Sequence, residues 1–125
     1  MNKMNYKSIN FDEKLNLFNE HWQPKVISEM NDYQFKIAKI KGEFIWHSHK
    51  DTDETFIVLK GEIKIDFKDG KVVVKQGEMF VVPAGVEHRP SSYEESHIML
   101  IEPKGVVNTG EIVDSNLRAE NDVWI

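Results

Sequence analysis

Four residues of the sequence have the side chains and the spacing that a metal site requires. His47 and His49 stand two residues apart in a run that favours a strand, so both side chains project from the same face. Glu54 opens the next apolar run, and His88 follows much later, just after Pro83-Ala84-Gly85. Three neutral imidazoles and one carboxylate suit a divalent transition metal, whereas calcium and magnesium prefer more oxygen ligands. The residue types therefore predict a site for one ion of manganese, iron, nickel, cobalt or zinc.

Glycine and proline residues frame these side chains at regular distances. Gly42 precedes His47, and six residues separate Glu54 from Gly61. Gly77 is followed, after five residues, by Pro83-Ala84-Gly85 and then by His88. This arrangement, from residue 33 to residue 102, resembles the two motifs of the cupin superfamily. The sequence departs from the motifs twice, because the gap before His47 is one residue short and Ser92 replaces a final Asn.

The resemblance implies both a fold and a ligand set. It implies a double-stranded β-helix, or jelly-roll barrel, whose interior holds the metal on His47, His49, Glu54 and His88. Small cupins of this kind look similar to the mannose-6-phosphate isomerase group. Sugar-phosphate chemistry would require a positive clamp on the phosphate, yet the chain has only Arg89 and Arg118, and Arg89 is expected to point away from the pocket. These residues therefore give no support to a sugar-phosphate substrate.

Length and patterning favour one all-β domain. A chain of 125 residues can bury a substantial core, and its short apolar runs are separated by Gly, Pro and Asp-Gly turns that favour antiparallel strands. Asn10 and Glu13 have the spacing of a capping box and predict one short helix over about residues 11–19. We expect a single domain over residues 1–125, with a barrel core at about 24–102 and a C-terminal tail at 103–125.

Charge and composition argue against several classes of partner. The formal net charge of -5 disfavours nucleic acid, because binding to phosphates requires clustered Lys and Arg. No apolar run approaches the ~20 residues of a membrane span. The absence of Cys excludes disulfides and thiolate ligands and agrees with a reducing compartment. We therefore expect a cytoplasmic protein that binds neither nucleic acid nor membranes and has a small molecule as its ligand.

Strand alternation predicts which side chains line the pocket. If His47 and His49 point inward, Ile45 points inward as well, and the same rule places Phe56 and Val58 inside after Glu54. The expected pocket is a largely apolar sleeve that suits a small, weakly polar ligand. Its predicted lining is Phe35, Ile37, Ile45, Phe56, Val58, Met79, Val81, Ser92 and Met99.

The same alternation directs Phe44 and Trp46 outward. Trp46 is too large to be left in water, so we interpret it, with Phe44 and Trp22, as a contact between the subunits of a homodimer. The alternative is that the N-terminal helix or the C-terminal tail covers it.

Two residues are candidate catalytic proton carriers. His97 lies on the last long strand and is either a pocket base or a partly buried, hydrogen-bonded histidine. Glu43 is either a general base at the pocket mouth or a solvated carboxylate at a strand end. Asp51 and Asp53 are rivals of Glu54 as the carboxylate ligand, but their place in a polar loop favours solvated charges.

Two classes of function remain open. A metal with free coordination positions would support isomerisation, epimerisation or dioxygenation. The alternative is a non-catalytic module that binds or senses a metal or a small molecule, since the sequence shows no convincing acid-base pair beyond the ligands. A fold alone does not decide between them.

Overall fold

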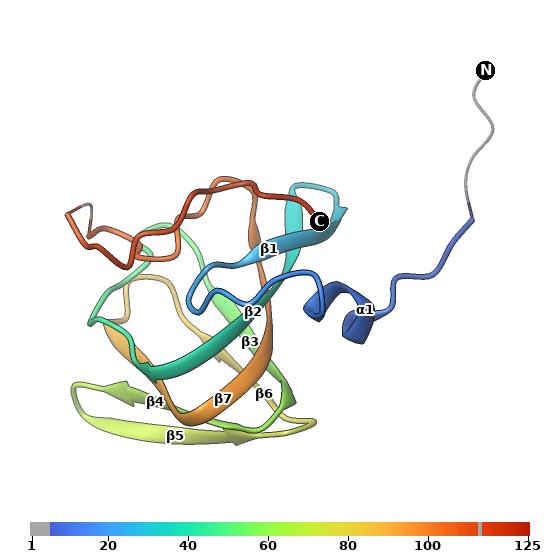
Figure 1. The fold of residues 1–125 in the computed structure, drawn as a ribbon. Helices are drawn as coiled ribbons and strands as arrows, with labels where there is room; N and C mark the ends of the chain where they lie inside the picture. Colours follow the sequence, from blue (N-terminus) through green and yellow to red (C-terminus); the bar gives the residue numbers. More distant parts are fainter. Residues whose placement is uncertain (1–5, 113) are drawn as a thin grey trace.

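The computed structural model describes residues 6–112 and 114–125 and consists mainly of strands (Figure 1). One short helix precedes the strands. The elements, in chain order, are α1 (Phe11–Leu15), β1 (Lys25–Met30), β2 (Tyr33–Glu43), β3 (Glu54–Lys60), β4 (Glu62–Phe67), β5 (Gly70–Lys75), β6 (Met79–Val82) and β7 (His88–Pro103).

The long strand β7 joins the two halves of the barrel. Its pairing with β2 and β3 places it in the middle of the order β1-β2-β7-β3-β6, and its first residues also pair with β4, which in turn pairs with β5. All the strand pairs are antiparallel. The structure therefore confirms the all-β jelly-roll barrel with a short N-terminal helix.

Two apolar clusters lie on opposite faces of the sheet. The interior cluster includes Ile40, Val58, Ile65 and Ile98, all of which are almost fully buried. The second cluster lies on the outer face, where α1 covers β2 and β7; it consists of Leu15, Phe18, Ile27, Ile37 and Met99. Both faces of β2 and β7 are thus buried, one by the barrel and one by the helix.

The helix is shorter than the predicted span of 11–19. The Asn10 side chain accepts a hydrogen bond from the Glu13 backbone N–H, so half of the expected capping box is present. The helix ends at Leu15, with Asn16 as its C-cap. Beyond it, Phe18 turns its side chain into the outer cluster and its carbonyl towards Lys39 Nζ at 2.7 Å, which a continued helix would not allow.

The C-terminal segment crosses the end of the barrel beside β1 and away from β4 and β5 (Figure 1). Val26 of β1 donates a backbone hydrogen bond to Val123 and accepts one from Ile125. The last residues therefore pack against the first strand. Among the described residues, no helix is long and apolar enough to cross a membrane.

Candidate metal centre

The two histidine-bearing stretches are joined directly by backbone hydrogen bonds. His47 N–H donates to the His88 carbonyl at 3.0 Å, and His88 N–H donates to the His47 carbonyl at 2.9 Å. Gly85 N–H donates to the His49 carbonyl at 2.9 Å. Asp53 accepts a hydrogen bond from Ala84 N–H at 2.9 Å and so holds the turn that precedes His88. The loop aspartate, expected to be a solvated charge, thus has a structural contact.

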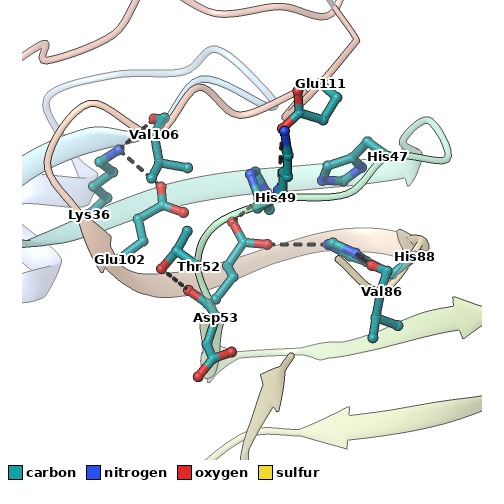
Figure 2. A network of polar contacts seen from close by, with 12 residues as sticks. Lys36, His47, His49, Thr52, Asp53, Val86, His88, Glu102, Val106 and Glu111 are labelled. Atoms are coloured by element: carbon teal, nitrogen blue, oxygen red, sulfur yellow. Dashed lines mark hydrogen bonds and ion pairs between the residues drawn. The ribbon is translucent and has the colours of Figure 1, made fainter. Parts of the chain in front are cut away.

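The structure brings together the four residues singled out as ligands. One ligand atom from each of His47, His49, Glu54 and His88 lies within 4.8 Å of all the others. The Glu54 carboxylate lies between two rings, with 3.3 Å from Oε2 to His49 Nε2 and 3.3 Å from Oε1 to His88 Nε2 (Figure 2). All four residues are buried, and even His49, the most exposed, is only 6% exposed. A cluster of this composition is one that could hold a metal ion.

Backbone carbonyls orient two of the three rings. Ile45 O lies 2.9 Å from His47 Nδ1, and Val86 O lies 3.0 Å from His88 Nδ1. Because a carbonyl oxygen can only accept, each Nδ1 carries a proton, and Nε2 is the ring nitrogen left to bind a metal. The buried Nε2 of His49 lies 3.3 Å from Glu54 Oε2, but no described residue meets it in hydrogen-bond geometry. An unsatisfied buried nitrogen is costly, and a cation would satisfy it.

Burial and neighbouring charges set the protonation states of His47 and Glu54. Burial, followed by the neighbouring His88, lowers the pKa of His47 to about 4. Burial alone would raise the pKa of Glu54, but the His49 and His88 rings outweigh it and hold that pKa well below its ordinary value. At neutral pH His47 is therefore neutral and Glu54 is ionised, which are the forms that bind a metal.

A second carboxyl group, Glu102, lies behind Glu54 and was missed by the sequence reasoning. Its Oε1 lies 2.9 Å from Lys36 Nζ, in a pair whose side chains are 1% and 4% exposed (Figure 2). Burial and the adjacent Glu54 carboxylate raise the pKa of Glu102 well above its ordinary value, against the opposing effect of Lys36. The other carboxyl oxygen of Glu102, Oε2, is buried and has no hydrogen-bond partner among the described residues. No sequence signal marked this pair, since Lys36 and Glu102 are far apart in the chain and belong to no motif.

A small cavity lies beside the cluster, with a volume of about 30 Å³. Its walls are mainly apolar, and a stacked pair, Trp22 and Phe44, with ring centroids 4.7 Å apart, forms one of them. Phe44 also meets the His47 ring edge-on at 5.2 Å. The residues that line the cavity are Trp22, Pro24, Ala38, Ile40, Phe44, His47, Glu54, Phe56, Pro90, Ile98, Leu100 and Asn108. This space accommodates about one water molecule.

Most residues of the predicted pocket lining do not line this cavity. Phe56 lines the cavity, and Val58 is part of the interior core around it. Ile45 does not line it, and Phe44, expected to point outward, takes that place. The reason is that β2 ends at Glu43, just after Gly42 at φ +80°, so strand alternation no longer applies to the next residues.

The other predicted lining residues lie elsewhere. Phe35, Ile37 and Met99 face the outer cluster under α1. Met79 and Val81 are on the outer side of β6, 56% and 43% exposed. Ser92 is buried but hydrogen-bonds to the Glu62 carbonyl and to Ser96 instead. In β2 and β6 the structure reverses the expected inner and outer faces.

The two candidate catalytic residues also lie outside the cavity. His97 lies on the outer face of β7 and contacts Glu95 at 3.3 Å. The Glu43 side chain is 68% exposed and pairs with Arg89 at 3.2 Å. Arg89 in turn contacts Asp66 at 3.0 Å, so it points away from the cluster as expected.

The C-terminal segment covers the histidine side of the cluster. Glu111 N–H donates to the Ser48 carbonyl at 3.1 Å, and Glu111 Oε1 accepts from Lys50 N–H at 3.3 Å. Asn108 secures the segment from within, because its side chain donates to the carbonyls of Trp22 and Leu117 at 2.9 Å each. Access to the cavity from this side therefore requires the segment to move.

Comparison with known proteins gives consistent matches. A family model described as a cupin domain matches residues 35–102. A cupin-2 domain containing protein from Shewanella frigidimarina is 57% identical, with a TM-score of 0.76 over 77% of this chain and 94% of the other. The uncharacterized protein YdbB of Bacillus subtilis is 44% identical over 79 residues, which are 62% of this chain and 70% of YdbB.

A more distant match shares the fold alone. Hydroquinone 1,2-dioxygenase from Sphingomonas sp. TTNP3 is 23% identical, with a TM-score of 0.68. The match covers 78% of this chain and 32% of that one.

Proposed function

The chain belongs to the cupin domain family, and on that premise we propose that it binds one divalent transition metal ion through His47, His49, Glu54 and His88. The observation that carries the proposal is the gathering of four buried donor atoms within 4.8 Å. The Nε2 of His49 supports it, since this buried nitrogen makes no hydrogen bond with a described residue and a cation beside Glu54 would satisfy it. The donor set suits manganese, iron, nickel, cobalt or zinc.

We further propose that the metal acts on a small, weakly polar organic ligand. The apolar walls formed by Trp22, Phe44 and Phe56 support this choice. A bound ion would supply Lewis-acid or oxygen-binding chemistry, in the service of isomerisation, epimerisation or dioxygenation. Because the cavity measures about 30 Å³, an organic ligand enters only when the C-terminal segment or the Trp22–Phe44 pair moves.

The alternative is a module that binds its metal or ligand without turnover. It is favoured by the positions of His97 and Glu43, which leave the cavity without either candidate proton carrier. A mannose-6-phosphate isomerase type of reaction gains no support, because Arg89 is paired with Asp66 and Glu43 outside the cavity.

The experiment that tests metal binding is elemental analysis by mass spectrometry. Tag-free protein is purified without chelators or added metal, as wild type, His49→Ala and the control His97→Ala. We expect near one metal ion per chain in the wild type and the control, and loss of the metal in His49→Ala. No metal in the wild type after reconstitution with each candidate ion would overturn the proposal. A thermal-shift survey of metabolites then separates the alternatives, since a ligand recovered unchanged favours binding and its conversion favours an enzyme.

The homodimer and the cytoplasmic location remain predictions. Trp46 does not support the dimer as expected, because Lys68 and Arg89 cover its ring at 4.0 and 5.1 Å. The support now comes from Met79 and Val81, which expose apolar surface on the outer side of β6. Light scattering after gel filtration would test it, with Val81→Glu expected to shift a dimer towards monomer.

A further inference from the structure

The five histidines of the chain fall into two groups. Three of them belong to the buried cluster, and the other two, His21 and His97, meet at a single carboxylate on the outer face of the barrel. His21 Nε2 lies 2.7 Å from Glu95 Oε1, and His97 Nε2 lies 3.3 Å from Glu95 Oε2. Two imidazoles and one carboxylate, which are donors that transition metals accept, thus gather outside the site described above.

The fold brings these three side chains together from separate parts of the chain. His21 lies in the segment between α1 and β1, which runs beside β2 and forms a bridge there with Lys39 (Figure 1). Lys39 is paired on its other side with His97 of β7. Glu95 lies two residues before His97 on the same strand, so both side chains project from the same face. The Glu95 carboxylate therefore joins the N-terminal segment to β7.

Both rings can offer a nitrogen to an ion. Among the described residues, neither Nδ1 has a hydrogen-bond partner, so each ring can carry its proton on Nδ1 and present the lone pair of Nε2 at Glu95. The two nitrogens approach different oxygens, and an ion bound to all three residues draws them closer together. The His21 and Glu95 side chains, which are 37% and 43% exposed, can make this movement without disturbing the core.

The surrounding charges indicate how strongly such a site binds. Lys39 is adjacent to His97, but its Nζ donates to the Phe18 carbonyl at 2.7 Å and is engaged there. Lys60 of β3 is also adjacent to His97 and is exposed, so its charge opposes a cation. The formal net charge of -5 favours the approach of cations. A site here is therefore weaker than the buried cluster, which offers four donors.

We propose that His21, Glu95 and His97 form a second site, for a divalent transition metal ion such as Zn²⁺. Two imidazoles and a carboxylate, with water as the fourth ligand, are a donor set that Zn²⁺ accepts at about 2.0–2.2 Å. An ion at this place ties the segment between α1 and β1 to β7. Trp22 follows His21 directly and lines the cavity beside the buried cluster, so the ion also holds one wall of that cavity.

Titration of the metal-free protein with Zn²⁺ in a calorimeter tests the proposal. The proteins are wild type, His21→Ala, Glu95→Gln and His97→Ala. The matched control is Glu94→Gln, which removes the same charge from the neighbouring, exposed residue of β7. His49→Ala isolates the second site by removing a ligand of the buried cluster. NMR spectra of the histidine rings, recorded with and without Zn²⁺, identify the ligands.

We expect wild type and Glu94→Gln to bind two Zn²⁺ ions per chain, and each of the three site variants to bind one. In His49→Ala, Zn²⁺ should still shift the ring signals of His21 and His97 and raise the unfolding temperature, because the second site is intact. An exposed site with three ligands is emptied when the protein is purified without added metal. It therefore leaves the stoichiometry expected above for purified protein unchanged.

The outcomes separate this site from the buried cluster. If the three site variants bind as many ions as the wild type, the second site is refuted and the buried one stands. If a single ion is bound, lost in His21→Ala and kept in His49→Ala, the second site is supported and the buried one is refuted. If His49→Ala does not fold, the wild type decides: ring signals of His21 and His97 that shift with Zn²⁺ support the site, and unchanged signals refute it.

Discussion

Replacement of Gly110 by Ala tests whether the C-terminal segment closes the metal centre. Gly110 has φ +59°, and a methyl group at this position would collide with the Ser48 carbonyl oxygen and reach 3.3 Å from His49 Nδ1. The Ser48 carbonyl belongs to the backbone between two proposed ligands and cannot move away without disturbing them. We therefore expect the segment, rather than the histidine loop, to give way.

The size of the effect follows from two contributions. A left-handed backbone costs an Ala side chain about 1 kcal/mol or slightly more. Displacing the segment also breaks the hydrogen bonds from Glu111 N–H to Ser48 O and from Lys50 N–H to Glu111 Oε1, each worth about 1 kcal/mol. Gly110→Ala should therefore lower the free energy of unfolding by about 3 kcal/mol. The matched control is Gly105→Ala, at φ +94° in the same segment, where a Cβ has no described heavy atom within 4 Å. Gly105→Ala has the backbone strain without the collision, so its free energy of unfolding should fall by about 1 kcal/mol.

Urea unfolding measures the stability, and transfer of bound metal to excess EDTA measures the access. We expect Gly110→Ala to release its metal faster than wild type and Gly105→Ala to release it at the wild-type rate. Equal stability losses and equal release rates in the two variants would refute the reasoning, because the collision with Ser48 would then have no consequence.

Three further changes give separate tests. Asn108→Ala removes three hydrogen bonds of the side chain: two that it donates, to the Trp22 and Leu117 carbonyls, and one that it accepts, from Ala119 N–H at 2.8 Å. The free energy of unfolding, measured in urea, should fall by about 3 kcal/mol. The exposed Asn116→Ala is the control and should change it little. Phe44→Ala should cost about 3 kcal/mol in the same assay, because it leaves a void between Trp22 and His47. The pKa of His47 is lowered to about 4, so the metal-free folded state binds fewer protons than the unfolded chain between pH 4 and 6.5, and stability should fall by about 3 kcal/mol as pH drops through that window. The raised pKa of Glu102 acts in the opposite sense, since it removes stability as pH rises above the ordinary carboxyl value. The His47 effect is therefore measured in Glu102→Gln, and a flat profile there would contradict it.

The candidate ligands could be predicted from the sequence because their spacing along the chain is recognisable even where the backbone is not a regular strand. His47 and His49 lie together although the backbone around them is not a regular strand, since the backbone hydrogen bonds between His47 and His88 fix that loop. The fold class could also be predicted from the sequence, because short apolar runs separated by turn residues indicate antiparallel strands.

Alternation alone could not predict which side chains of each strand point into the barrel. In β6, Met79 and Val81 are as apolar as Phe80 and Val82, so the pattern permits either face inward. The register on β3, which sets Val82 opposite Glu54, decides that Val82 faces the interior. This pairing is a long-range contact that no local pattern in the sequence encodes.

Strand β2 reverses the usual rule that apolar side chains face the interior and charged side chains face outward. This reversal explains where the buried polar residues gather. Ile37 faces outward because α1 covers that surface, whereas Lys36 faces inward because Glu102 receives it. At the other end of the interior, Ile63, Ile65 and Val74 form an apolar core without such a pair. The barrel thus places its apolar packing at one end and its buried charges at the end where the candidate ligands lie. Rules about which side chains face a core fail first at functional sites, because side chains there bind a ligand rather than fill the core. The buried Lys36 is the clearest such failure among the described residues, and its partner Glu102 lies on the strand that pairs with β3, which carries the candidate ligand Glu54.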